Sequence, residues 1–177
     1  MLTRFADGVH AMKIVVAASI LTMSSLIAPA YAQSPITASE FAMKASVGNT
    51  FEVEESKLAL KQAASAKVKA FARMMIKDHT AAEKKLMAAA KGAGPVEMKL
   101  DEPHQTMVTA LQSQTGDAFD KAYVADQVQS HQETAALLGD YATSGDNAKL
   151  KTWAKLILPK VEMHLKKVQA MPAQAAL

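Results

Sequence analysis

The chain of 177 residues contains no cysteine. No disulfide can therefore stabilise the fold, which must be held together by side-chain packing alone. The same absence excludes a lipoprotein that is anchored through a cysteine. It also restricts the ligands of any metal site to histidine, carboxylate and methionine side chains.

Strand patterns and the patterns that identify enzymes are missing as well. No segment shows the alternation of apolar and polar residues that is typical of a strand. The glycine cluster at Gly92 and Gly94 follows a helical pattern and lacks the spacing of a phosphate-binding loop. Serines and threonines lie mostly where helices should begin, and no nucleophile with a neighbouring base stands out. The sequence therefore points to no particular reaction.

A short apolar run near the N-terminus is typical of a secretory signal peptide. Lys13 precedes the apolar run 14–27, and Ala30-Tyr31-Ala32 has the small residues of a cleavage site. We therefore expect a signal peptide over 1–32, with Met12 as an alternative start, and a single domain over 33–177. The run is too short to favour a membrane-spanning helix, and an uncleaved anchor is the alternative.

This N-terminal pattern predicts export. We expect the periplasm, with the extracellular space or association with the outer membrane as alternatives. Export argues against nucleic acid as a partner, and we expect no transmembrane segment after cleavage. Residues 33–177 contain eighteen Lys and Arg against sixteen Asp and Glu, so their net charge is close to zero. Weak contact with anionic membrane surfaces and assembly into a homo-oligomer are the partner hypotheses that remain.

The rest of the chain is rich in residues that favour helices, chiefly Ala, Leu, Met, Lys, Gln and Glu. Caps and glycines divide it into four long helical segments, at about 37–64, 66–91, 117–143 and 147–171. Thr37 and Glu40 should form a capping box at the first segment, and Asp146 should cap the last.

A long connection over 92–116 separates the two pairs of helices, and it should contain a short helix over about 103–114. The segments AKVKAFAR (66–73) and AKLKTWAK (148–155) are similar, and each opens the second helix of a pair. Ferritin-like bundles have this connectivity. We therefore predict an all-α, ferritin-like four-helix bundle of two helical hairpins joined by a long crossover.

Polar residues interrupt the apolar stripes of these helices. Three helices place one histidine each on the inward face, and the first helix places glutamates there: His79, His131, His164, Glu52 and Glu55. The histidines lie close to the middle of their helices, so they can meet whichever way the helices run. Buried imidazoles cost free energy unless each finds a partner. We therefore expect either a metal site or a hydrogen-bonded network of histidine, glutamate and tyrosine.

Four segments cover most of residues 38–171: FAMKASVGNTFEVEESKLAL, VKAFARMMIKDHTAAEKKL, FDKAYVADQVQSHQETAALL and LKTWAKLILPKVEMHLKKV. They resemble domain-of-unknown-function family 4142, a ferritin-like family whose members are often labelled predicted outer-membrane proteins. The family pattern falls on Glu52, Asp78-His79, Tyr123, His131, Pro159 and His164. The resemblance implies a four-helix ferritin-like fold and brings no established activity.

The ordinary di-iron carboxylate site of ferritin-like proteins is not expected. Such a site needs a glutamate three residues before a histidine, so that both lie on one helix face. The residues in that position here are apolar: Ile76, Val128 and Val161. The chemistry that depends on two bridged irons therefore has no support in the sequence.

A different ligand set remains, namely His79, His131 and His164 with Glu52 or Glu55. Imidazole-rich sites suit one transition metal ion such as Zn, Cu or Fe. We expect an exported, non-enzymatic envelope or stress-related binding protein with a central His/Glu site that can bind a metal. One alternative is a periplasmic metalloenzyme, redox or hydrolytic, that uses the same residues. A second alternative is a purely structural or assembly module.

Overall fold

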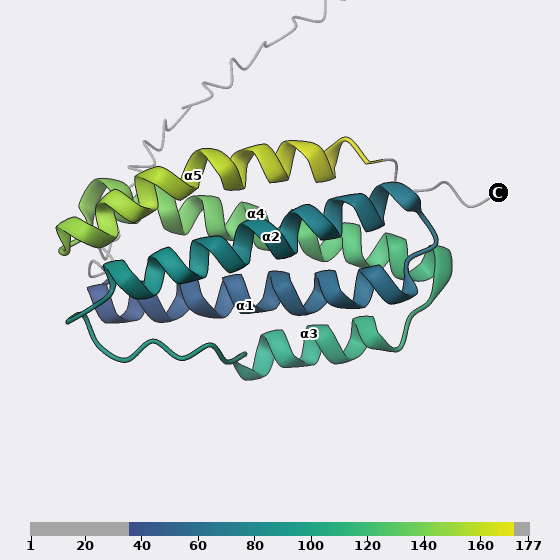
Figure 1. The fold of residues 1–177 in the computed structure, drawn as a ribbon, viewed down its shortest axis with the longest axis horizontal. Helices are drawn as coiled ribbons and strands as arrows, with labels where there is room; N and C mark the ends of the chain where they lie inside the picture. Colours follow the sequence, from purple (N-terminus) through teal and green to yellow (C-terminus); the bar gives the residue numbers. More distant parts are fainter. Residues whose placement is uncertain (1–35, 172–177) are drawn as a thin grey trace, which may run out of the picture. The chain divides into compact units, whose positions relative to one another are not determined.

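The computed structural model describes residues 36–171, which form five α-helices and no β-strand. The helices are α1 (Ala38–Gln62), α2 (Ala66–Ala89), α3 (Glu102–Gln112), α4 (Gly116–Ser144) and α5 (Ala148–Gln169) (Figure 1). The expected signal peptide over 1–32 lies outside the described residues.

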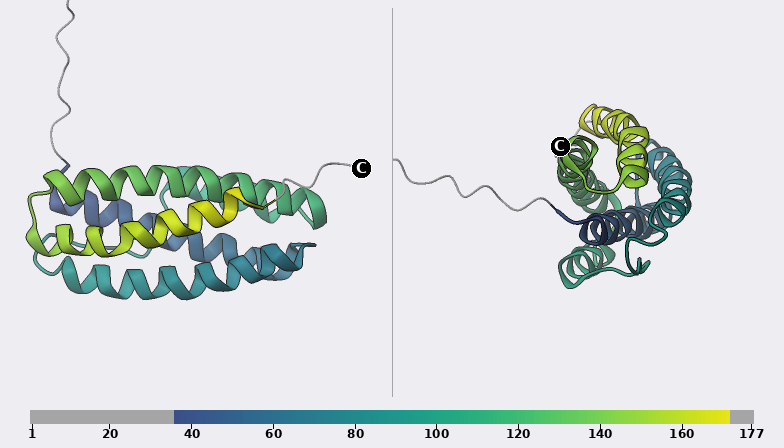
Figure 2. Two further views of the ribbon diagram at one scale, coloured as in Figure 1. Left: turned by 90° about the horizontal axis from the view of Figure 1, so that it is seen from above. Right: turned by 90° about the vertical axis from the view of Figure 1, so that its left-hand side faces the viewer.

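The four long helices form a bundle of two antiparallel hairpins. Helix α1 packs along α2 and α4 packs along α5, while further contacts join α1 to α4 and α2 to α5 (Figure 2). The long connection from α2 to α4 carries the short helix α3, which packs against α1. This is the predicted ferritin-like connectivity. None of the helices in the described range is long and apolar enough to cross a membrane.

Local signals explain where the first helices begin. At α1, the Thr37 hydroxyl accepts from the Glu40 backbone N–H at 3.3 Å, and the Glu40 carboxylate accepts from the Thr37 backbone N–H at 2.9 Å. This is the predicted capping box. Side-chain oxygens of Ser65 and Asp101 cap α2 and α3.

The prediction that Asp146 caps the last helix is wrong. The side chain of Asn147 accepts from the first backbone N–H groups of α5 and is the cap. Asp146 instead accepts a hydrogen bond from the Tyr141 hydroxyl at 2.8 Å. Both Asp146 and Asn147 are suitable caps, but Asp146 is hydrogen-bonded to Tyr141, and Asn147 caps the helix.

Two apolar clusters fill the bundle. In the first cluster the rings of Phe41 and Tyr141 stack with centroids 3.8 Å apart, and Trp153 packs edge-on against Phe41. The second cluster includes Phe71 and Met75. Between the two clusters each long helix also buries polar side chains: Glu52 and Glu55 on α1, His79 on α2, His131 on α4 and His164 on α5. The bundle thus has a polar layer between two apolar layers.

Candidate metal centre

His79 of α2, His131 of α4 and His164 of α5 converge in this polar layer. The centroids of their rings are 5.7 Å apart for His79 and His131, 5.5 Å for His79 and His164, and 5.6 Å for His131 and His164. One ring nitrogen from each histidine lies within 4.8 Å of one from each of the others. All three side chains are buried, with exposed fractions of 4%, 1% and 1%. We call these three residues the histidine triad.

Two members of the triad hydrogen-bond to groups that can only accept. His131 Nδ1 lies 2.8 Å from the backbone carbonyl oxygen of Gln127, and His164 Nε2 lies 3.0 Å from Oδ2 of Asp78. Burial raises the pKa of Asp78, but hydrogen bonds from Lys160 and His164 lower it further, to below its ordinary value. Asp78 is therefore ionised. Each of these ring nitrogens therefore carries the hydrogen, and the other nitrogen of a neutral ring keeps a free lone pair.

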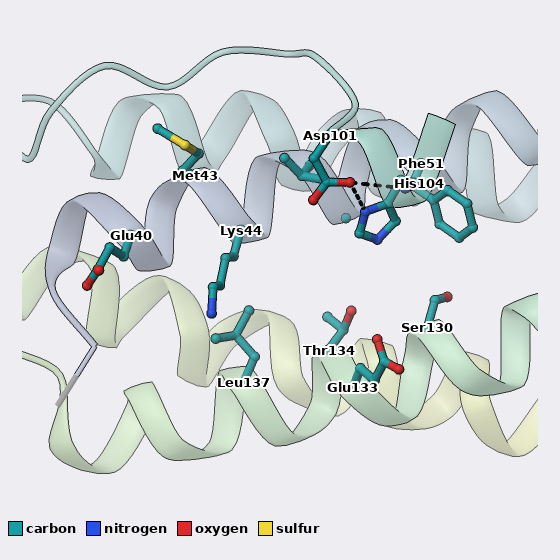
Figure 3. Close-up of a pocket in the computed structure, with 12 residues that line it drawn as sticks. Glu40, Met43, Lys44, Phe51, Asp101, His104, Ser130, Glu133, Thr134 and Leu137 are labelled. Carbon is teal, nitrogen blue, oxygen red and sulfur yellow. Dashed lines mark hydrogen bonds and ion pairs between the residues drawn. The ribbon is translucent and has the colours of Figure 1, made fainter. Parts of the chain in front are cut away.

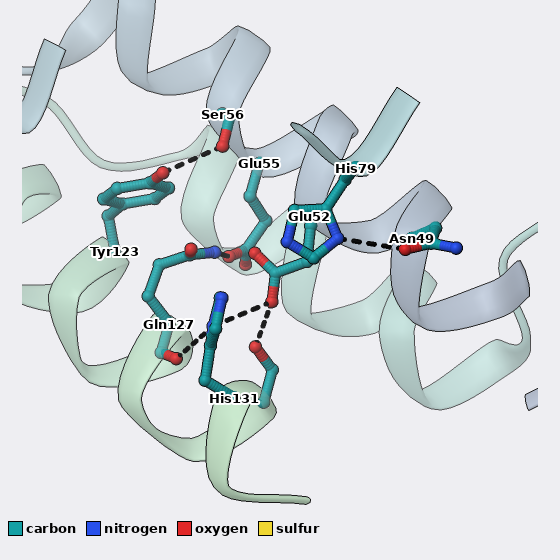
Figure 4. Close-up of polar contacts among 9 residues, drawn as sticks. Asn49, Glu52, Glu55, Ser56, His79, Tyr123, Gln127 and His131 are labelled. Atoms are coloured by element: carbon teal, nitrogen blue, oxygen red, sulfur yellow. Dashed lines mark hydrogen bonds and ion pairs between the residues drawn. The ribbon is translucent and has the colours of Figure 1, made fainter. Parts of the chain in front are cut away.

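The third imidazole is oriented by an amide whose own direction is fixed. Asn49 Nδ2 donates to Glu83 Oε2 at 2.9 Å, and so Asn49 Oδ1 faces His79 Nδ1 at 3.0 Å (Figure 4). Ser46 also donates to Glu83, at 2.6 Å, which holds this carboxylate in place. Because the amide oxygen accepts, the hydrogen of His79 is on Nδ1 and the lone pair is on Nε2.

The second nitrogen of each ring is buried and has no hydrogen-bond partner within residues 36–171: Nε2 of His79, Nε2 of His131 and Nδ1 of His164. Burial and the other imidazoles lower the pKa of His79 well below its ordinary value, and burial lowers that of His164 to about 4. Both rings are therefore neutral at pH 7. A buried acceptor without a partner costs about 1–3 kcal/mol, and a cation bound between three such acceptors would remove this cost.

Glu52 of α1 lies beside the triad. Its Oε1 accepts a short hydrogen bond from the Ser130 hydroxyl and lies 3.4 Å from Nδ1 of His131 (Figure 4). Glu52 thus meets His131 at the protonated ring nitrogen and not at the free one. Burial raises the pKa of Glu52, although the nearby His131 and the hydrogen bond from Ser130 oppose this.

Glu55 lies one turn further along α1. Its Oε2 accepts from the Gln127 side-chain amide at 3.1 Å. Burial, together with the charges of Glu52 and Asp126, raises the pKa of Glu55 to about 10, so this carboxyl group is protonated at pH 7. Among the described residues, neither glutamate belongs to the group whose potential ligand atoms lie within 4.8 Å of one another.

A groove of about 480 Å³ approaches the centre between α1, α3 and α4 (Figure 3). Met43 and His104 line it, and it reaches Ser130, whose hydroxyl donates to Glu52. The ring of His104 packs edge-on against Phe51, with centroids 4.8 Å apart, and its Nδ1 lies 2.5 Å from Asp101. His104 therefore lies apart from the triad.

The sequence analysis did not identify Asn49, Glu83 or Ser130 as parts of the site. The sequence does contain a signal for Asn49. Polar residues follow one another at the three- and four-residue spacing of one helix face, namely Ser46, Asn49, Glu52 and Ser56. Spacing alone does not separate a buried polar face from a solvated one. All four residues are buried in the structure.

Two solved structures share this fold. One is described as "CopM in the Cu(II)-bound form", with 17% identity and a TM-score of 0.65, and the match covers 77% of this chain and 95% of that chain. The other is "CopM in the Cu(I)-bound form", with 16% identity and a TM-score of 0.63, covering 76% and 94%. At this level of identity the likeness shows the fold alone.

No curated protein matches the chain. A sequence family described as "Domain of unknown function (DUF4142)" matches residues 24–171, which is most of the chain. The resemblance noted in the sequence is thereby confirmed. The protein belongs to the DUF4142 family.

Proposed function

We propose that this protein is an exported binding protein that holds one transition metal ion between His79, His131 and His164. The observation that supports this most strongly is the set of three buried ring nitrogens, each fixed as an acceptor and each without a partner in the described bundle. In a trigonal site with metal–nitrogen bonds of about 2.0 Å, the nitrogens are about 3.5 Å apart. Small rotations of the three rings would reach this geometry.

The groups behind the triad support the same proposal. Metal-binding imidazoles usually donate their second ring N–H to a carbonyl or a carboxylate, which fixes the tautomer and the ring orientation. Asn49, the Gln127 carbonyl and Asp78 supply these three acceptors. The carboxylate of Asp78 also places negative charge beside His164, 3.0 Å from its Nε2.

Copper is the metal that we favour among Zn, Cu and Fe. Imidazole ligands suit all three metals, and copper binds most tightly to a given set of nitrogen ligands. Two structures of the same fold are described as the Cu(II)-bound and Cu(I)-bound forms of one protein, CopM. An all-histidine site without a carboxylate pair also differs from the di-iron sites of ferritin-like proteins.

The role of the glutamates is a separate proposal. Glu52 lies at the protonated nitrogen of His131, where it would orient this ring. The predicted ligand set also includes Glu52 or Glu55, and this is supported by Glu52 Oε2 and Glu55 Oε1, which are buried and unpaired among the described residues.

Burial of the triad favours a binding protein over an enzyme. The three histidines are at most 4% exposed, and a redox or hydrolytic metalloenzyme would need an open coordination position that a substrate can reach. A storage, buffering or stress-related role in the cell envelope needs only reversible binding of the ion. Burial therefore supports the expected non-enzymatic binding protein over the metalloenzyme alternative.

The test is the metal content of the mature protein, purified from its native compartment without a chelator or a histidine tag and measured by mass spectrometry. We expect about one equivalent of copper in wild type and its loss in a triple His79→Ala, His131→Ala, His164→Ala variant. His104→Gln is the matched control and should keep the metal, because His104 lies apart from the triad. A folded wild type that takes up neither copper nor zinc after reloading would contradict the proposal.

A second candidate role, contact with anionic membrane surfaces, is favoured by the distribution of charge. Helix α2 carries six Lys and Arg against two acids, and α5 carries six Lys against one acid. Helix α4 carries one Lys against five acids. Because α2 and α5 pack side by side (Figure 2), one face of the bundle is basic, and a basic face is attracted to anionic lipids.

Sedimentation with lipid vesicles tests this role. We expect binding to vesicles that contain phosphatidylglycerol at low salt, and release when salt screens the charges. Equal binding to neutral vesicles, or none at low salt, would contradict it. Light scattering in the same buffers would separate this outcome from self-association of the chain.

A further inference from the structure

A metal site that is buried in a helical bundle needs a route by which the ion reaches it. His79 is the triad member that lines an outward-facing pocket, a cavity of about 370 Å³ on the side of α1 and α2. Asn49 and Glu83, which orient His79, line the same pocket. The inner end of this pocket is therefore the imidazole whose Nε2 is free.

Two methionines line the outer part of this pocket. Met87 lies on α2 and is 47% exposed, and Met98 lies in the connection after α2 and is 63% exposed. Methionine often fills gaps in a core, and Met75 of the second apolar cluster, fully buried, does so here. That explanation does not apply to Met87 and Met98, because both side chains are exposed.

The structure holds Met98 at this position through the same residues that orient His79. The Ser46 hydroxyl lies 2.6 Å from Glu83 Oε1 and 3.2 Å from the backbone carbonyl oxygen of Glu97, the neighbour of Met98. The carboxylate of Glu83 in turn accepts from Asn49, the partner of His79. These contacts place the segment that carries Met98 beside the residues that orient His79.

The chemistry of these side chains selects one class of ion. Thioether sulfur is a soft, uncharged ligand that suits Cu(I) and does not compete with imidazole for hard divalent ions. The charged groups of the pocket wall do not offer a strong cation site, because Glu54 is paired with Lys57 at 2.7 Å and Glu83 is already hydrogen-bonded. The pocket combines soft ligands at its mouth with the His79 side chain in its wall.

We propose that this methionine pocket, defined by Met87, Met98 and His79, is the route by which a monovalent copper ion enters the protein. Met87 and Met98 capture the ion weakly at the surface, and His79 receives it by ligand exchange and passes it to the rest of the triad. No electron is transferred, and the ion keeps its charge. This inference rests on the proposed metal site. It adds the oxidation state of the bound copper ion and the path by which the ion reaches the histidine triad.

The variant that tests the route is Met87→Leu with Met98→Leu, because leucine keeps the size of the side chain and removes the sulfur. The matched control is Met43→Leu, since Met43 is 43% exposed and lines the groove on the other side of α1. The first measurement is the rate at which metal-free protein takes up Cu(I) from a weak chelator under anaerobic conditions. We expect the double variant to load several-fold more slowly than wild type, with the same final capacity, and the control to load like wild type.

A second measurement follows the methionine methyl groups by NMR while Ag(I) is added as a redox-inert substitute for Cu(I). The methyl signals of Met87 and Met98 should move at the lowest Ag(I) concentrations, before those of Met43. Zn(II) should leave them unchanged. These signals report the pocket directly and do not depend on the loading rate.

The outcomes separate the two proposals. If wild type and the double variant load at the same rate, or if Met87 and Met98 do not respond to Ag(I), the methionine route is wrong and the metal site stands. If wild type takes up no copper at all, the metal site is wrong and the route falls with it. Slow loading in the Met43→Leu control would also overturn the route, because the effect would then not be specific to the pocket.

Discussion

Asn49 bonds His79 and Glu83 with the two ends of one amide group. Its nitrogen donates to Glu83 at 2.9 Å, and its oxygen lies 3.0 Å from His79 Nδ1. An amide offers its donor and its acceptor in fixed positions, so the bond to Glu83 decides which side faces His79. The free lone pair of His79 is therefore set by a residue that does not belong to the triad.

The first prediction concerns this amide. Asn49→Leu removes the acceptor of His79 and one of the two donors to Glu83, so His79 can change tautomer and rotate. We expect the affinity for copper to fall by about 10–100-fold, which is usual when a group behind a metal ligand is lost. Competition with a chelator of known affinity measures it.

Gln62→Leu is the control for Asn49→Leu. The Gln62 amide also makes two hydrogen bonds, at 2.9 Å and 2.8 Å, but to the backbone carbonyls of Gln112 and Gln114, away from the triad. This variant should lose stability and keep its copper affinity. An Asn49→Leu protein that binds copper like wild type would show that the amide does not position His79.

The second prediction separates the two contacts of Asp78. Its carboxylate accepts from His164 at 3.0 Å and pairs with Lys160 at 3.1 Å. Asp78→Ala should weaken copper binding by about tenfold or more, because His164 loses its acceptor. Lys160→Gln removes only the exposed partner, and a surface pair contributes about 0–1 kcal/mol to stability. If both variants weaken copper binding equally, the ion pair of Asp78 with Lys160, and not its contact with His164, is what copper binding depends on.

The third prediction concerns the stability of the metal-free protein in acid. In the folded state the pKa of His164 is lowered to about 4 and that of His79 lies well below 6.5, whereas both titrate near 6.5 when unfolded. Between these values the unfolded state binds more protons, so the free energy of unfolding falls as the pH drops below about 6.5. The stability that depends on neutral His79 and His164 is therefore fully present above about pH 6.5.

Urea unfolding at a series of pH values checks this dependence. His164→Gln should flatten the curve below about pH 6.5, because it removes one of the titrating groups. Gln62→Leu removes no titrating group and should keep the wild-type slope. A wild-type protein whose stability does not change between about pH 6.5 and 4.5 would contradict the lowered pKa values of His79 and His164.

The fourth prediction concerns Glu55, whose pKa is raised from 4.5 to about 10 in the folded state. Between these values the folded state keeps a proton that the unfolded state releases, so the free energy of unfolding falls as the pH rises. The limit for one proton is about 1.4 kcal/mol per pH unit. Glu55→Gln, which is neutral at every pH, should remove this fall and gain stability over wild type with increasing pH.

Unfolding of the metal-free proteins between about pH 5 and 9 measures the difference. Glu54→Gln is the control, because Glu54 is partly exposed and bonded only to Lys57 among the described residues. Parallel curves for wild type and Glu55→Gln would mean that Glu55 is ionised in the folded protein.

The sequence by itself determined the helices, the connectivity and the inward position of the three histidines. Caps such as Thr37 and Ser65 act within one turn of their own helix, and the three- and four-residue spacing of apolar positions marks the buried face. A histidine on that face near the middle of a helix, such as His79 or His131, meets its neighbours in either helix direction. These are properties of one helix at a time.

Only the tertiary structure decided which atoms of the site are available. The free nitrogen is Nε2 in His79 but Nδ1 in His164, because Asn49 lies at one side of the first ring and Asp78 at the opposite nitrogen of the second. Glu52 faces the protonated side of His131, although its helix position also suits a ligand. Asp146 leaves the cap of α5 to Asn147 because Tyr141 binds it. Helical spacing specifies a face, whereas hydrogen bonds between helices select a single atom, and those partners come from distant parts of the chain.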